Sequence, residues 1–157
     1  MGLDMYLTRH IRIDNYDFDA SSEILASAVL CALKIKNPNQ YNNCSISIGL
    51  PAGYWRKANA IHKWFVENVQ NGQDNCEPFS VDSTQLKELH SLCERVIADR
   101  SLAKKLLPPQ DGFFFGDTNL DDWYFQELES TIEIIDDALN PENAVNNHNT
   151  FTYRASW

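Results

Sequence analysis

The sequence lacks the patterns that mark metal-binding, disulfide-rich and membrane proteins. It has four cysteines, but none forms a C-x-x-C pair, and no histidine or cysteine stands at zinc-ligand spacing from another. We therefore expect neither a metal site nor a disulfide framework. The longest apolar run, ILASAVLCAL, is too short to span a bilayer, and no cationic leader precedes an apolar segment. These absences predict a soluble, cytoplasmic protein without membrane contact.

Positive charge is scarce. Lysine and arginine total 13 against 22 aspartate and glutamate, for a formal net charge of -9. The summed field repels a phosphate backbone, so we expect no direct general binding of nucleic acid. The same excess suits a protein partner that is itself basic, such as one whose surface normally holds DNA or RNA.

The common catalytic signatures are missing as well. The chain has no Walker loop, no G-x-S-x-G elbow, no H-E-x-x-H and no G-x-G-x-x-G. Their absence argues against the common nucleotide hydrolases and α/β-hydrolases. We predict no cofactor, no metal and no catalytic residue, and a binding role ahead of an enzymatic one.

What the chain does have is enough apolar material for a core. At 157 residues, with 43% hydrophobic and 11% aromatic residues, it falls among ordinary globular proteins. The length predicts a single domain over residues 1–157.

Alternating polarity predicts strands near both ends of the chain. In residues 2–13, Leu3, Met5 and Leu7 alternate with polar neighbours, which is the period of a strand with one buried face. Residues 44–50 alternate in the same way, as do residues 150–157. We expect the first and last of these strands to be neighbours in one sheet.

Helical spacing and capping residues predict the remaining elements. Ser21 or Ser22 can cap a helix over 23–36 that ends with Lys34 and Lys36, and an amphipathic helix follows over 54–70. Asp82 and Gln85 form a capping box before a helix over 83–98. A last helix, capped by Asn119, ends at Pro141. The predicted fold is α+β, a small and mainly antiparallel sheet covered by about four helices.

The outer stripe of the 54–70 helix is the first candidate site. Arg56, Asn59 and Lys63 could clamp a phosphate or a carboxylate, with Lys57 and Trp64 beside them. The alternative is a solvated face on which Lys63 pairs with Glu67. On the same helix we expect His62 to be a core or boundary histidine in preference to a general base.

A second candidate depends on the pairing of the terminal strands. Asp4 and Tyr6 share one strand face and could form a polar pocket with Tyr153 or Arg154. The alternative is the solvent side of an edge hairpin.

The third candidate is the aromatic segment GFFFGDTNLDDWYF, residues 112–125. Asp117 and Trp123 lie within it, and its rings could stack on a base or anchor a partner protein. The alternative, a core corner where loop and helix pack, accounts for at least half of these aromatics.

Several long strings resemble a family of small bacteriophage and prophage proteins. They are MGLDMYL at the start, GYWRKANAIHKWFVENVQNG in the middle, GFFFGDT followed by DDWYF, and ASW at the end; residues 14–50 carry none of the resemblance. The resemblance implies a phage gene and supplies no catalytic residues. Small acidic proteins of phage accessory genes often counter host defence, an argument by analogy.

Two functions follow as expectations. The first is a phage-encoded, non-enzymatic binding protein in the host cytoplasm that inhibits a host immune protein such as a CRISPR effector. The alternative is a sponge, or a weak enzyme, for a nucleotide-like ligand bound by Arg56, Asn59, Lys63 and the aromatics around Trp123.

Overall fold

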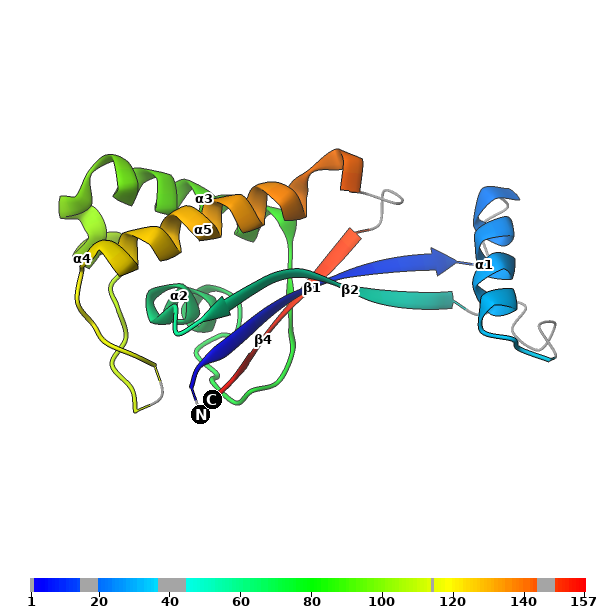
Figure 1. Ribbon diagram of the computed structural model, residues 1–157, viewed down its shortest axis with the longest axis horizontal. Coiled ribbons are helices and arrows are strands. Elements are labelled where there is room, and N and C mark those ends of the chain that lie inside the picture. Colours follow the sequence, from blue (N-terminus) through cyan, green and yellow to red (C-terminus); the bar gives the residue numbers. More distant parts are fainter. Residues whose placement is uncertain (1, 15–19, 37–44, 114, 144–148) are drawn as a thin grey trace.

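A four-stranded antiparallel sheet with helices on one face makes up the fold. The computed structural model describes residues 2–14, 20–36, 45–113, 115–143 and 149–157. The strands are β1 (Asp4–Asp14), β2 (Ser45–Arg56), β3 (Phe79–Val81) and β4 (Asn149–Ser156), in the order β2-β1-β4-β3. The α-helices are α1 (Ala20–Ala32), α2 (Asn59–Asn68), α3 (Ser83–Ala98), α4 (Ala103–Leu106) and α5 (Asp122–Leu139). This confirms the predicted α+β class and the adjacent terminal strands (Figure 1).

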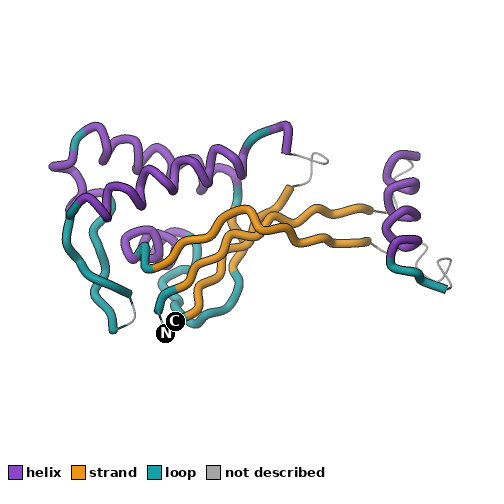
Figure 2. Tube along the Cα trace, viewed as in Figure 1, coloured by secondary structure: helices purple, strands orange, loops and turns teal. Residues whose placement is uncertain are grey.

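The two faces of the sheet differ because side chains alternate along each strand. Leu3, Met5 and Leu7 are at most 1% exposed and point into the core, whereas Tyr6 lies on the opposite face. On the core face the ring of Phe65 from α2 stacks on Tyr153 of β4, with centroids 3.8 Å apart. Helices α3 and α5 lie side by side over the same face (Figures 1 and 2).

The two long helices begin where the sequence supplies caps. The carboxylate of Asp82 accepts hydrogen bonds from the backbone of Thr84 and Gln85, and Gln85 completes the predicted capping box of α3. Asp121 caps α5 by accepting from the backbone N–H of Tyr124. The prediction of Asn119 as this cap is therefore wrong by two positions. Helix α5 ends at Leu139, just before Pro141, as predicted.

The predicted helix over 54–70 is the main correction. Strand β2 continues through Arg56 and helix α2 begins only at Asn59. Pro51 and Gly53 do not end the strand, because a bulge opposite Leu7 and Thr8 absorbs the extra residue. Gly53 is needed there, since a Cβ on it would come within 2.5 Å of Ile134 on α5.

Two further expectations also change. Helix α1 begins at Ala20 and ends at Ala32, so Ser21 and Ser22 lie inside it and Lys34 beyond it, with a left-handed φ of 55°. The short strand β3 has no counterpart in the predicted elements.

Helix α1 lies across the far end of the β1–β2 hairpin, where Ile11, Ile13 and Ala26 form a small cluster of their own (Figure 1). Within the described ranges, no helix is long and apolar enough to cross a membrane.

Candidate functional site

A cleft forms where the end of β2, the start of α2, the 115–121 loop and the first turns of α5 meet. It consists of two cavities of about 270 Å³ each, both lined by Trp123 and Glu127. The first is also lined by Lys57, Asn59, Asp117, Asn119 and Asp121, and the second by Tyr54, Arg56, Gln126 and Ser130. We call these residues together the Trp123 cleft. Five predicted site residues gather here: Arg56, Lys57, Asn59, Asp117 and Trp123.

Lys57 enters the Trp123 cleft from a strained position between β2 and α2. Its φ is +61°, in the left-handed region that non-glycine residues rarely occupy. Its N–H donates to the carbonyl of Leu3 at 2.8 Å, and its own carbonyl accepts from Asn59 at the same distance. A Cβ built on Gly116 would lie 3.5 Å from the Cβ of Lys57, so the lysine stem packs directly against that glycine. Strain of this kind concentrates at functional sites.

Asn59 positions the loop on the other side of the cleft. It is only 5% exposed, and its amide nitrogen donates to the carbonyls of Phe115 (3.2 Å) and Asp117 (2.8 Å). Its oxygen accepts from the backbone N–H of Gln110 at 3.4 Å. The prediction that Asn59 lies on an outer, solvent-facing stripe is wrong, because α2 starts at this residue and turns it inward.

Trp123 and Glu127 form the shared wall of the two cavities, one turn apart on α5. Trp123 is 68% exposed. Desolvation raises the pKa of Glu127 from 4.5 to about 7, and the charge of Asp121 adds to this, while a hydrogen bond from the Trp123 side chain lowers it. The only donor on that side chain is the indole N–H, so the carboxylate orients the ring. A carboxyl group titrating near neutral pH in a cleft marks a functional-site candidate.

The carboxylate of Asp117 is held in place by its neighbour. The backbone N–H and the side-chain amide of Asn119 donate to its two oxygens, at 2.6 and 2.9 Å. With Asp121 and Glu127, it gives the first cavity three carboxyl groups facing one lysine. Together with the indole face, this lining suits a cationic group of a ligand or partner.

Five predicted site residues lie away from the cleft: Asp4 and Tyr6 on β1, Lys63 and Trp64 on α2, and Tyr153 on β4. Lys63 pairs with Glu67 at 4.0 Å, which is the alternative considered for it. Trp64 is 5% exposed and packs edge-on against Phe65. Tyr153 is fully buried on the core face. The predicted clamp of Arg56, Asn59 and Lys63 on one helix face does not form, because Arg56 belongs to a strand.

His62 is the core histidine that its position on α2 predicts. It is 0% exposed, with Nδ1 2.8 Å from the hydroxyl of Tyr153 and Nε2 3.1 Å from Asp74. Burial lowers its pKa from the usual 6.5, more than Asp74 raises it. Neither cavity of the Trp123 cleft is lined by His62, whose two ring nitrogens instead face Tyr153 and Asp74 inside the fold.

Asp4 and Tyr6, the residues of the second predicted candidate, lie on the sheet face opposite the core, and neither lines a cavity of the Trp123 cleft. Asp4 of β1 accepts a hydrogen bond from the hydroxyl of Tyr54 and lies 3.9 Å from the guanidinium of Arg56. The rings of Tyr6 and Tyr54 are 5.5 Å apart. Arg154 of β4 is the cross-strand partner of Tyr6. We call this group, Asp4, Tyr6, Tyr54, Arg56 and Arg154, the open face; Tyr153, which alternates with Arg154, points the other way.

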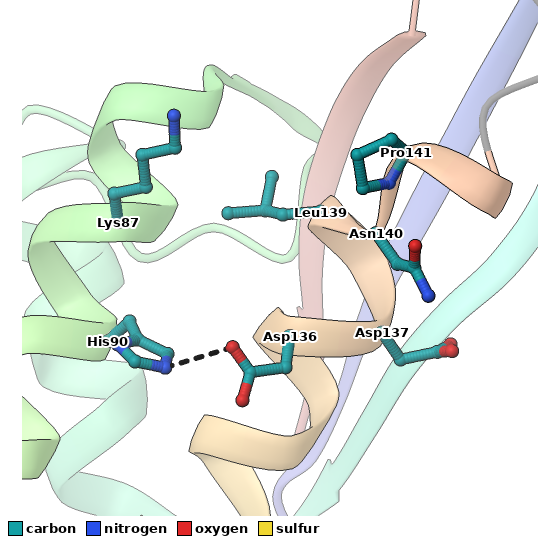
Figure 3. A pocket seen from close by; sticks show the side chains of 7 residues that line it. All are labelled: Lys87, His90, Asp136, Asp137, Leu139, Asn140 and Pro141. Atoms are coloured by element: carbon teal, nitrogen blue, oxygen red, sulfur yellow. Dashed lines mark ion pairs between the residues drawn. The ribbon is translucent and has the colours of Figure 1, made fainter.

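A larger and shallower hollow of about 600 Å³ lies between α3 and the end of α5 (Figure 3). His90 on α3 lines this hollow, with its Nε2 atom 3.1 Å from Asp136 and its Nδ1 atom 3.5 Å from Glu94. Both ring nitrogens thus face carboxylates, and His90 ties the two helices together. Among the residues that the structure describes, no group of three or more histidine, cysteine, aspartate or glutamate side chains could hold a metal ion.

Reasoning from the sequence missed Glu127 and Tyr54. Glu127 follows Trp123 by four residues, so helical spacing could have placed both on one face. Tyr54 was missed because the sequence placed it in a helix.

No family model, curated protein or solved structure matches this chain, so its function is inferred from the Trp123 cleft and the open face.

Proposed function

We propose that this chain is a non-enzymatic binding protein that holds a basic partner protein at the Trp123 cleft. One observation carries the proposal: an indole ring, 68% exposed, stands beside a half-buried carboxyl group between two adjoining cavities. Exposed tryptophans at cavity rims are the side chains that most often anchor protein interfaces. A lysine or arginine of the partner would lie over the indole and near Glu127.

The charge of α5 supports a basic partner. The helix carries six acidic residues and no basic one: Asp122, Glu127, Glu129, Glu133, Asp136 and Asp137. Most of them are exposed, so they extend the acidic surface beyond the cleft along the helix. Complementary potentials of this kind steer association and fix orientation.

The resemblance to phage proteins supports the class of partner. Small acidic proteins of phage accessory genes often counter host defence, by analogy, and defence nucleases such as CRISPR effectors bind nucleic acid on basic surfaces. On this proposal the acidic side of the chain occupies such a surface and excludes the nucleic acid.

The test is a plating assay on a bacterial host that expresses a CRISPR nuclease directed against the infecting phage. The wild-type chain should restore plaques, and Trp123→Ala should abolish the rescue. The matched control is Ile24→Ala, because Ile24 is 69% exposed but lies on α1 at the other end of the molecule. Both variants should keep the wild-type melting temperature, since neither side chain contributes to the core.

A binding measurement then separates this proposal from an indirect effect. The tagged chain should capture the purified nuclease, and Trp123→Ala should weaken the complex about tenfold or more. If no defence system is blocked and the chain captures no basic protein from a host lysate, the proposed function is wrong.

A further inference from the structure

The open face carries a chemistry different from the rest of the molecule. Helices α3 and α5 lie over the other face of the sheet, and Tyr6 and Tyr54 are 42% and 49% exposed. The two tyrosines are cross-strand partners near the start of β1 and the end of β2. Their rings are tilted by 48°, so together they present a broad aromatic platform above the sheet.

Cations flank this platform on both sides. Arg56 lies on β2, with its side chain 63% exposed, and Arg154 lies across from Tyr6 on β4. The Nε of Arg154 donates to the carbonyl of Cys76 at 3.1 Å, which ties the guanidinium to the loop before β3. With Asp4 as the one acidic member, the open face has a charge of +1 on a chain whose net charge is -9.

We propose that the open face binds single-stranded nucleic acid, with bases stacked on Tyr6 and Tyr54 and phosphates at Arg56 and Arg154. Base stacking on aromatic side chains contributes about 1–3 kcal/mol per base and tolerates any sequence. An antiparallel four-stranded sheet that presents exposed aromatics is the platform used by a common class of RNA-binding domain. This site shares Tyr54 and Arg56 with the Trp123 cleft, so Tyr6 and Arg154, which line neither cavity of that cleft, are the residues that test it separately.

The shape of the face favours a strand over a free nucleotide. Small ligands bind in concave pockets that bury most of their surface. The open face is a sheet surface, and the cavity that reaches Tyr54 and Arg56 is completed by residues of α5 and is not lined by Tyr6 or Arg154. A strand can lie across a flat sheet and add up several weak contacts, whereas a single nucleotide makes too few.

The experiment measures fluorescence anisotropy of labelled oligo(dT) and oligo(U), of about 12 nucleotides, with the full chain at about 50 mM salt. Wild type should bind both strands, and Tyr6→Ala should weaken binding by at least about fivefold, the loss of one stacked base. Tyr6→Phe keeps the ring and should bind like wild type. Unchanged far-UV circular dichroism confirms that each variant is folded.

The salt dependence tests the arginines separately. Each phosphate neutralised on a single strand contributes about -0.7 to the slope of log K against log salt concentration. Arg154→Ala should therefore reduce the slope by about 0.7, while Arg154→Lys should keep it. Lys104→Ala is the matched control, because it removes an equal charge from the exposed surface of α4.

Four results would overturn the proposal. The first is no binding of either strand at low salt. The second is equal loss in Lys104→Ala and Arg154→Ala, which indicates diffuse attraction. The third is full competition by uridine monophosphate, which makes the ligand a free nucleotide. The fourth is a Tyr6→Ala variant that binds strands normally but no longer captures the host nuclease, which makes the open face a protein interface.

Discussion

The Nδ1 atom of His62 lies 2.8 Å from the hydroxyl oxygen of Tyr153, with neither side chain exposed to solvent. On the other side of the ring, Nε2 faces the carboxylate of Asp74, which can only accept. Nε2 must therefore carry the proton, and Nδ1 accepts from the tyrosine hydroxyl. Asp74 also accepts from the indole N–H of Trp157 at 3.0 Å. This chain of hydrogen bonds joins α2, the loop before β3 and the last strand through a neutral imidazole.

The neutral state of His62 predicts a dependence of stability on pH. The pKa of His62 is lowered from 6.5 in the folded chain. Below about pH 6.5 the unfolded chain therefore binds a proton at this residue that the folded chain does not bind. The free energy of unfolding should thus decrease as the pH falls, by up to about 1.4 kcal/mol per unit. Glu127 acts in the opposite direction: its pKa is raised from 4.5 to about 7, so its contribution decreases as the pH rises through that window.

The two slopes partly cancel in the wild type, and urea titrations of single variants separate them. Glu127→Gln should reveal the His62 slope, with stability rising as the pH increases toward 6.5. His62→Gln should show the reverse and smaller slope, because Glu127 is partly exposed and screened by solvent. A Glu127→Gln variant whose stability stays constant over this range would contradict a neutral, buried His62.

A second prediction concerns the hydroxyl of Tyr153. In Tyr153→Phe the ring can still stack on Phe65, but Nδ1 of His62 is left buried without a donor. An unsatisfied buried acceptor costs about 1–3 kcal/mol of unfolding free energy. Tyr6→Phe is the matched control, since the hydroxyl it removes is on the exposed side of the sheet and its loss should change stability by less than about 0.5 kcal/mol. Urea midpoints at pH 7 compare the two.

Elements with a strong local signal were predictable from the sequence. The capping box of α3 involves residues three apart, and the alternation of β1 and β4 follows from one buried face, so both were placed correctly. The boundary between β2 and α2 could not be predicted from the sequence. Apolar residues from Trp55 to Phe65 fit a helical wheel, and the contacts that place Trp55 in a strand are distant in sequence: its pairing with Met5 of β1 and the hydrogen bond from its indole to Thr131 on α5.

The residues of the candidate site could be predicted only in part, because residue type is a local signal and the meeting of residues from different elements is not. Residue types alone pointed to Lys57, Asp117 and Trp123, because cations, carboxylates and aromatics near turns are unusual enough to notice. Their meeting in one cleft depends on how α5 packs against the end of β2, which no local pattern encodes. Tyr153 was wrongly predicted to be a site residue, because the register of β4 decides which of its side chains face the core. One position along β4 separates the buried Tyr153 from Arg154 on the open face.

Asn59 provides a third prediction, on the order of the loop that it holds. Asn59→Ala removes two hydrogen bonds to the carbonyls of Phe115 and Asp117 and leaves both without that donor. We expect a loss of about 2 kcal/mol in unfolding free energy and faster hydrogen exchange in residues 110–117. Asn68→Ala is the control: it removes an amide that donates to the carbonyl of Trp64 within the same helix, so it should cost less than about 0.5 kcal/mol and leave exchange in the loop unchanged. Unchanged exchange in the loop would show that Asn59 does not position it.

Lys57 provides the last prediction, because strain and function act on it in opposite directions. Its φ of +61° is left-handed, a conformation in which glycine avoids a steric cost of about 1–2 kcal/mol. Lys57→Gly should therefore leave the unfolding free energy equal to or higher than that of the wild type, even though the lysine stem no longer packs on Gly116. If the ammonium group takes part in binding at the Trp123 cleft, the same variant should bind the partner more weakly. Lys34→Gly is the matched control, since Lys34 is also a lysine with a left-handed φ, +55°, at an exposed position after α1 and outside the cleft. It should gain stability and bind like wild type. Equal stability gains with unchanged binding in both variants would mean that the strain at Lys57 serves the chain reversal alone.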